Sequence, residues 1–255
     1  MPQSDWYLVG ASVQGTTHKK NAVPCQDAHQ YTLLPNGPLI ITVADGAGSA
    51  QQSAQGAAMA AVAAMNRMVG ALQTQVRPMN IDWQELLSDA FDHARQALTN
   101  LAAEKEIALR AFATTLTCVV VAGDHLAIGQ IGDGIIVLQQ ENGRLVAPLP
   151  PQRGEYANET VFLTTNHAPD QLQFEISTRP VKAVAVMTDG LMRLAMNLPE
   201  QTPHTPFFQP LLTFATQVTD NETAQAQLVS FLASERVCAR TDDDKTLVLA
   251  VKHGE

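Results

Sequence analysis

The most constraining feature of the sequence is an apolar run, residues 39–44, that ends abruptly on Asp45 and a glycine-rich turn. A short, uninterrupted apolar run bounded by turn residues is typical of a buried strand. Gly46 and Gly48 would let the backbone turn tightly and approach a ligand closely. The Ala- and Met-rich residues 49–72 predict a helix after the turn. We therefore expect strand, turn and helix, with a carboxylate at the turn.

Strand, glycine turn and helix also occur in dinucleotide-binding folds, which require G-x-G-x-x-G and an acidic residue roughly 20 positions later. Here Gln51 replaces the third glycine, and no Asp or Glu occurs between Asp45 and Asp82. Asp45 would also repel a pyrophosphate at the start of the helix. A metal-carboxylate site is the remaining functional hypothesis, and an Asp that only opens the turn or caps the helix is the structural alternative.

Composition narrows the class of protein. The 255 residues, 45% of them hydrophobic, suffice for a packed core, and because no linker or repeat interrupts the chain we expect one domain over 1–255. The formal net charge of -9 argues against nucleic acid as a partner. No apolar run of about 18 residues and no signal sequence occur, so we expect no membrane span and a cytoplasmic location. Three scattered cysteines predict inert thiols.

The rest of the chain alternates short β-rich runs with helical patterns. Strands are expected at 6–14, 26–34, 115–122, 125–131, 135–140, 174–177, 183–187 and 246–251, and helices at 83–103, 207–217 and 223–234. Residues 15–25 are polar and predict a turn-rich segment. Residues 148–171 contain four prolines and predict a long flap loop with a short strand near 160–164.

Several carboxylates stand at the ends of these strands. Asp45 and Asp189 each follow an apolar strand and precede a glycine, and Asp243 belongs to an acidic triplet directly before the last strand. If the strands are neighbours, the carboxylates converge and repel one another unless a cation lies between them. Oxygen ligands without His or Cys favour Mg²⁺ or Mn²⁺ over Zn²⁺.

Structural alternatives exist for each of these residues. Asp189 is compatible with an ordinary turn and the triplet with a solvated loop. Gly132-Asp133-Gly134 is either a hairpin turn or a further carboxylate aimed at the site. The repeated pattern of strand, Asp and Gly favours the metal hypothesis over separate turns.

The ordered set of motifs resembles the metal-dependent type 2C Ser/Thr protein phosphatases, the PPM family, and most closely small stand-alone bacterial members. The motifs span residues 10–251 and are Gln26-Asp27-Ala28, Val43-Ala44-Asp45-Gly46, Phe112-Ala113-Thr114-Thr115, Gly132-Asp133-Gly134, Thr188-Asp189-Gly190 and Asp243-Asp244-Lys245-Thr246. The resemblance implies an α+β fold of four layers, in which a central β-sandwich is flanked by helix pairs.

The resemblance also implies a site with two Mn²⁺ or Mg²⁺ ions. Asp45 would bridge the ions, the Gly46 carbonyl would join one, and Asp189 and Asp243 would hold the other. Asp133 would help to bind a weaker third ion, and Asp27 would orient water on the metals. A hydroxide bridging the metals would hydrolyse phosphoserine or phosphothreonine in proteins. The expected partners are a phosphorylated protein substrate and a Ser/Thr kinase or its targets.

Two departures from the family pattern concern catalysis. Ala22 stands where the family usually has an arginine, so we expect His18, Lys19 or Lys20 to meet the phosphate. Ala47 replaces a His that is often assigned as general acid, and His18 or water on a metal would supply that proton.

Two further departures are Gln26, in place of a Glu, and Arg193, in place of an Asp. Gln26 weakens the surroundings of the second metal, whereas Arg193 is expected to be a surface or structural change. The departures leave a second hypothesis, a catalytically weak member that binds a phosphoprotein as a regulator. A purely structural β protein would leave the repeated Asp-Gly pattern unexplained.

Overall fold

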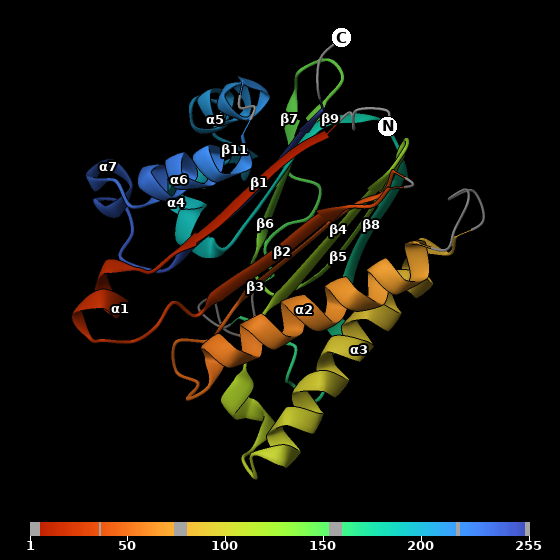
Figure 1. Ribbon diagram of the computed structural model, residues 1–255, viewed down its shortest axis with the longest axis vertical. Helices are drawn as coiled ribbons and strands as arrows, with labels where there is room; N and C mark the ends of the chain where they lie inside the picture. Colours follow the sequence, from red (N-terminus) through yellow and green to blue (C-terminus); the bar gives the residue numbers. More distant parts are fainter. Residues whose placement is uncertain (1–5, 36, 74–80, 153–159, 218–219, 253–255) are drawn as a thin grey trace.

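The computed structural model describes residues 6–35, 37–73, 81–152, 160–217 and 220–252. Two five-stranded antiparallel sheets face each other, and a pair of long helices covers the outer face of each (Figure 1). The predicted α+β architecture, a β-sandwich flanked by helix pairs, is confirmed. None of the helices in the described ranges is long and apolar enough to cross a membrane.

The two sheets combine strands from distant parts of the chain. The β1 sheet has the order β1 (Trp6–Val13), β12 (Lys245–Lys252), β9 (Val181–Met187), β6 (Ile135–Gln140) and β7 (Leu145–Val146). The β3 sheet has the order β2 (Asp27–Leu33), β3 (Leu39–Asp45), β4 (Leu116–Ala122), β5 (His125–Ile131) and β8 (Gln173–Thr178). A short ribbon pairs β10 (Met196–Asn197) with β11 (Thr202–Pro203).

Three apolar layers explain why the central strands are apolar on both faces. On β3, Ile41 and Val43 face the other sheet, whereas Ile40 and Ala44 face the helices. A strand that is covered on both sides lacks the polar and apolar alternation of a solvated sheet. The apolar run of residues 39–44 therefore belongs to a central strand of the sandwich.

The helices follow from their apolar stripes and caps. The β3 sheet is covered by α2 (Ser53–Leu72) and α3 (Trp83–Glu104), and the β1 sheet by α5 (Thr205–Gln217) and α6 (Asn221–Leu232). The side chain of Asp82 caps α3 by accepting from the Glu85 amide at 3.0 Å. The shorter helices are α1 (Thr16–Lys20), η2 (Leu109–Phe112), η3 (Pro169–Gln171), η4 (Asp189–Leu191), α4 (Met192–Ala195) and α7 (Glu235–Cys238).

Two local predictions are wrong. Residues 16–20, within the segment predicted to be turn-rich, form the helix α1, whose Thr17 amide donates to the Asp242 carbonyl at 3.0 Å. Residues 160–164 form no strand; the Leu163 amide bonds to the Thr114 carbonyl at 2.8 Å, and Arg95 donates to the Leu163 carbonyl. In this segment, hydrogen bonds to distant residues take the place of regular pairing with a neighbouring strand. Residues 153–159 of the predicted flap lie outside the described residues.

The three cysteines are unpaired. Burial raises the pKa of Cys25 to about 12 and also raises that of Cys118. Both thiols therefore stay protonated near neutral pH, and because the thiolate is the reactive form, Cys25 and Cys118 fit the prediction of inert thiols.

Candidate metal centre

Four aspartates meet where strands of the two sheets end. Asp45 is the last residue of β3, and Asp27, the first of β2, is its direct partner across this strand pair. Asp189 follows β9 as the first residue of η4, and Asp243 lies just before β12. The end of β9 lies beside the start of β12 because these neighbours are antiparallel. The convergence that the sequence argument required is thus present.

Asp27 ties the two sheets together at this point. Its Oδ2 accepts hydrogen bonds from the hydroxyls of Thr188 and Thr246, both at 2.8 Å. Its Oδ1 is buried without a hydrogen-bond partner among the described residues. Neither threonine was predicted to have a role, although each stands in an Asp-containing motif.

The main chain of Asp45 is held by two threonines after η2. The Thr115 amide and the Thr114 hydroxyl donate to the Asp45 carbonyl at 2.8 and 3.0 Å, and the Asp45 amide donates to the Thr115 hydroxyl at 2.9 Å. Every main-chain polar group of Asp45 therefore has a partner. The side-chain carboxylate is therefore the part of Asp45 that remains to bind a ligand.

Gly46 is required by crowding. A Cβ atom there would lie 2.7 Å from the Ser53 carbonyl oxygen and 2.8 Å from that of Gln26. The same atom at Gly48 would meet nothing closer than the Gln26 side chain at 3.9 Å. Of the two glycines that the sequence argument singled out, only Gly46 is needed for close approach.

Asp133 lies on a crossover between the sheets. The strands on either side of residues 132–134, β5 and β6, belong to different sheets, so the segment is not a hairpin turn. The Asp133 Oδ2 accepts from the Thr160 hydroxyl at 2.7 Å. Burial and the charge of Asp243 both raise the pKa of Asp133. The geometry therefore supports the second alternative, in which Asp133 is a further carboxylate near the site.

The carboxylates perturb one another strongly. Burial raises the pKa of Asp45 well above its ordinary value, and the charges of four other aspartates add to this effect. These are Asp27, Asp189, Asp133 and Asp243. Burial, opposed by its two threonine hydrogen bonds, raises the pKa of Asp27 to about 8, and burial with neighbouring charges raises that of Asp189 to about 6. The site is thus one acidic cluster.

The chemistry of this cluster fits a divalent cation. Asp45 and Asp189 lie within hydrogen-bond reach, yet ionised carboxylates only accept hydrogen bonds. Such a pair requires either a shared proton or a cation. As the side chains stand, no group of three or more His, Cys, Asp or Glu within the described ranges is arranged to hold an ion. The fit of the cluster to a divalent cation therefore rests on its negative charge and on its carboxylate oxygens, including the buried Oδ1 of Asp27.

Asp244 fastens the chain ends around the cluster. Its Oδ1 accepts from the Gly15 amide and its Oδ2 from the Gln26 amide, both at 2.6 Å. The Nδ1 of His18 lies 2.9 Å from Oδ2, as an ion-pair contact rather than a well-formed hydrogen bond. The structure therefore directs Nδ1 of His18 toward Asp244.

The other two members of the acidic triplet differ from Asp244. Asp243 is exposed, and the ammonium of the fully buried Lys245 donates to its main-chain oxygen at 3.1 Å. Asp242 is exposed and accepts from the Thr17 hydroxyl at 2.9 Å. Lys245 is a positioning contact that the sequence argument missed, and a lysine inside an otherwise apolar strand was its only signal.

Lys19 and Lys20, the other two predicted phosphate contacts, are on α1. Lys19 and Lys20 are exposed, and Lys20 lies close enough to Asp242 to lower its pKa slightly. Ala22 follows α1 with a φ of 54°. Ala47 is buried and offers no proton donor in its side chain.

Comparison with known proteins identifies the family. Residues 14–233 match the family model for protein phosphatase 2C. The chain belongs to the protein phosphatase 2C family. It is 40% identical over 252 residues to serine/threonine-protein phosphatase 3 of Escherichia coli K12, covering 96% of this chain and 98% of that protein.

Solved structures share the same fold. A bacterial serine phosphatase is 12% identical with a TM-score of 0.68, covering 97% of this chain and 98% of its own. The serine/threonine phosphatase of S. agalactiae is 13% identical with a TM-score of 0.67, covering 97% and 100%. The predicted family and enzyme class, a Ser/Thr protein phosphatase, are confirmed. The assignment of individual residues to metals and phosphate stays a prediction.

The acidic cluster predicts how the stability of this phosphatase depends on pH. The folded-state pKa values of Asp189 and Asp27, about 6 and about 8, exceed the ordinary value of 3.8, so the folded state binds more protons than the unfolded state between these limits. In EDTA, the cluster's contribution to the free energy of unfolding should fall as pH rises from 4 to 8. Thermal unfolding at pH 5 and pH 8 measures this.

The control for this prediction is the variant Asp45→Asn, which removes one charge from the cluster. The melting-temperature difference between variant and wild type isolates the cluster from other titrating groups. It should be larger at pH 8 than at pH 5, and an equal difference at both values would contradict the prediction.

Proposed function

We propose that this chain removes phosphate from phosphoserine and phosphothreonine in proteins, using two Mn²⁺ or Mg²⁺ ions held at the acidic cluster. The observation that carries the proposal is the half-buried end of the sandwich, where Asp45 lies within hydrogen-bond reach of Asp189. Two such groups need a cation to stay ionised together. The metal dependence of the protein phosphatase 2C family supports the same conclusion.

The proposed ligands follow the sequence argument. Asp45 would bridge the ions, the Gly46 carbonyl would join one, and Asp189 and Asp243 would hold the other. Asp133, whose Oδ2 accepts from the Thr160 hydroxyl, would serve a weaker third ion. When bound, the ions supply neutralisation of the phosphoryl oxygens and a lowered pKa of coordinated water.

The residues of the chain then position the reactants. Asp27 is anchored at Oδ2 by Thr188 and Thr246, so its unpartnered Oδ1 can accept a proton from water at a fixed place. The Ala47 side chain has no proton to donate. The leaving oxygen of the substrate therefore takes its proton from water or from His18.

One experiment tests the function. Hydrolysis of p-nitrophenyl phosphate and of a phosphothreonine peptide is measured with and without Mn²⁺, and Mn²⁺ binding is measured separately by calorimetry. We expect metal-dependent turnover in the wild type and loss of both turnover and tight binding in Asp45→Ala and Asp189→Ala.

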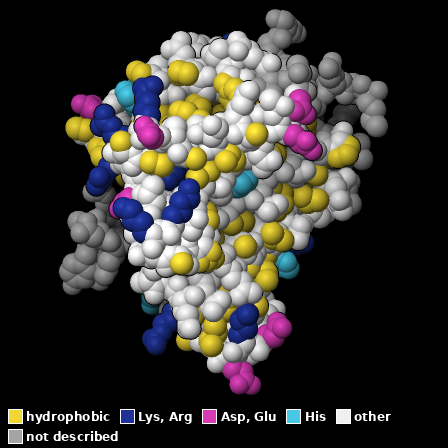
Figure 2. Space-filling model, turned by 60° about the vertical axis from the view of Figure 1, so that its left-hand side comes forward, with side chains coloured by type: hydrophobic (Ala, Val, Ile, Leu, Met, Phe, Trp, Pro, Cys, Tyr) yellow, Lys and Arg dark blue, Asp and Glu magenta, His cyan; other side chains and the backbone are white. Residues whose placement is uncertain are grey.

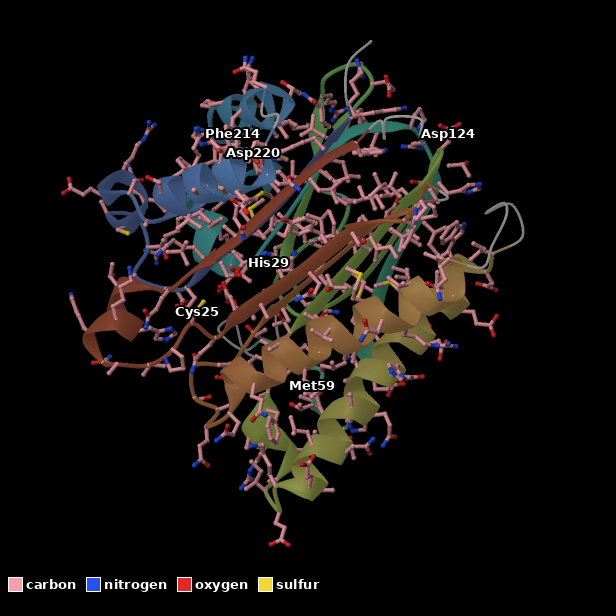
Figure 3. All side chains as sticks on the ribbon, in the orientation of Figure 1. Cys25, His29, Met59, Asp124, Phe214 and Asp220 are labelled. Atoms are coloured by element: carbon pink, nitrogen blue, oxygen red, sulfur yellow. The ribbon has the colours of Figure 1, made fainter. Side chains whose placement is uncertain are left out.

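The matched control is Asp124→Ala, because Asp124 lies in the β4–β5 hairpin at the opposite end of the sandwich from Cys25 and the start of β2 (Figure 3). This variant should behave as the wild type. Turnover that needs no metal, or that survives both substitutions at the cluster, would refute the proposal. Phosphopeptide binding without turnover would instead favour the regulator, which Ala22 and Ala47 motivate.

His18→Ala is expected to lower kcat or raise KM by roughly 10-fold, the size of effect of a positioned acid or binding group. The reason is that His18 contacts Asp244, which holds the Gly15 and Gln26 amides. Steady-state kinetics on the phosphothreonine peptide measures the effect. His93→Ala is the control, since His93 is exposed on α3. Kinetics equal to those of the control would remove His18 from the site.

The cellular setting is part of the proposal. We place the phosphatase in the cytoplasm as one domain over residues 1–255, acting on a phosphoprotein that a Ser/Thr kinase, or one of that kinase's targets, supplies. Cell fractionation and capture of phosphorylated proteins by an inactive Asp45 variant would test this setting.

A further inference from the structure

Two arginines on the rim of the acidic cluster have no role in the proposed reaction. Arg193 lies on α4, four residues after Asp189, and Arg240 follows α7, two residues before Asp242. Both are exposed, and neither lies within ion-pair distance of a carboxylate in the part of the chain that the structure describes. Their guanidinium groups are thus available to a ligand.

Two hollows meet at Arg193. A cleft of about 810 Å³ is lined by Asp133, Asp189 and Arg193, and its other walls include Leu149, Pro150, Met192, Met196 and Leu198. A smaller pocket of about 200 Å³ is lined by Asp189, Arg193, Arg240 and Asp243, among others. Because Asp189 and Arg193 line both, a substrate whose phosphate lies at Asp189 has Arg193 beside it.

A third cation lies nearby. Lys20 is on α1, and this helix is held against Asp242 because the Thr17 hydroxyl donates to the Asp242 carboxylate at 2.9 Å. Asp242 also lines the smaller pocket together with Arg193, so α1 borders this pocket. In Figure 2, where the side of the molecule with α1 and α7 comes forward, several Lys and Arg side chains gather on one part of the surface, with Asp and Glu side chains among them.

The charge at this rim is unusual for the chain. The protein has a net charge of -9, yet Lys20, Arg193 and Arg240 cluster here beside two exposed carboxylates, Asp242 and Asp243, of which Asp242 is already bonded to Thr17. Guanidinium groups bind carboxylates and phosphates through paired hydrogen bonds.

We infer that Arg193, Arg240 and Lys20 form an anion-binding subsite that selects phosphoprotein segments with a second anionic residue close to the target phosphoresidue. The second anion is an acidic side chain or another phosphate, and the apolar wall of the larger cleft takes a neighbouring apolar side chain. The inference rests on the proposed function, because ions must offset Asp189 and Asp243 before this rim attracts an anion.

The test compares three phosphothreonine peptides that differ only in the residues flanking the phosphothreonine, which are Glu, Gln or Lys. Each exposed ion pair contributes up to about 1 kcal/mol, or about fivefold. We expect the wild type to hydrolyse the Glu peptide with a kcat/KM about fivefold or more above that of the Gln peptide. A fourth peptide with phosphoserine as the flanking residue separates a second phosphate from a carboxylate.

The readout is the ratio between peptides, which does not depend on the overall activity of a variant. Arg193→Gln and the double variant Arg193→Gln/Arg240→Gln should bring the Glu-to-Gln ratio close to 1, and Arg193→Glu should favour the Lys peptide. Arg179→Gln is the control and should keep the wild-type ratio. Arg179 directly follows β8, whose last residue pairs with the first residue of β5, at the end of the sheet opposite the acidic cluster. The wild-type ratio should also shrink at high salt.

Each outcome has a distinct meaning. Equal hydrolysis of the Glu and Gln peptides by the wild type, or a preference that survives in the double variant, overturns the subsite and leaves the phosphatase intact. Absence of metal-dependent hydrolysis of every peptide overturns the proposed function itself.

Discussion

Replacing Asp45 by Asn should abolish metal-dependent phosphatase activity and, at the same time, stabilise the metal-free protein. Asn keeps the size of the side chain but removes a carboxylate whose pKa is raised by burial and by four neighbouring aspartates. Since the proposed ions would contribute several kcal/mol to transition-state stabilisation, we expect kcat to fall by at least about 1000-fold. Relief of charge repulsion should raise the melting temperature in EDTA by a few degrees.

The opposite signs of the two effects make this prediction specific. Kinetics with Mn²⁺ and thermal unfolding in EDTA at pH 8 are measured on the same preparations. Asp92→Asn is the matched control, because Asp92 is exposed on α3 and should change neither quantity. A variant that loses activity by losing stability would show that Asp45 holds the fold together rather than a metal.

The parts of the fold that sequence analysis predicted are those set by local patterns. The apolar run before Asp45 is uninterrupted because β3 is covered on both faces, and the period of α3 places its apolar residues against the β3 sheet. The Asp-Gly positions at 45 and 189 mark strand ends, so their approach required only that these strands lie in facing sheets.

The parts that were missed depend on contacts between residues far apart in the chain. The helix α1 is anchored by Asp242, about 225 positions away in the sequence, and no local signal reveals that partner. The anchoring of Asp27 by Thr188 and Thr246 likewise joins two sheets. Arg193 was predicted to be a surface or structural change, and the structure does expose it, but at the meeting of two hollows beside Asp189.

Replacing Gly190 by Ala is expected to damage the site through the backbone. A Cβ atom there would lie 1.9 Å from the main-chain oxygen of Asp244, so either η4 or the acidic triplet must move. Overpacking of this kind costs about 1–3 kcal/mol and should lower the melting temperature by roughly 2–12 °C. Because Asp189 and Asp243 adjoin this contact, a displacement of about 1 Å should lower kcat by about 100-fold.

Gly70→Ala is the control that separates this steric effect from the general cost of changing a glycine. Gly70 lies near the end of α2, is exposed, and has nothing within 4 Å of a built Cβ atom. Ala there should stabilise the protein by about 0.5–1 kcal/mol and leave kcat unchanged. If Gly190→Ala kept wild-type kcat and melting temperature, the contact between η4 and the acidic triplet would not be what positions Asp189 and Asp243.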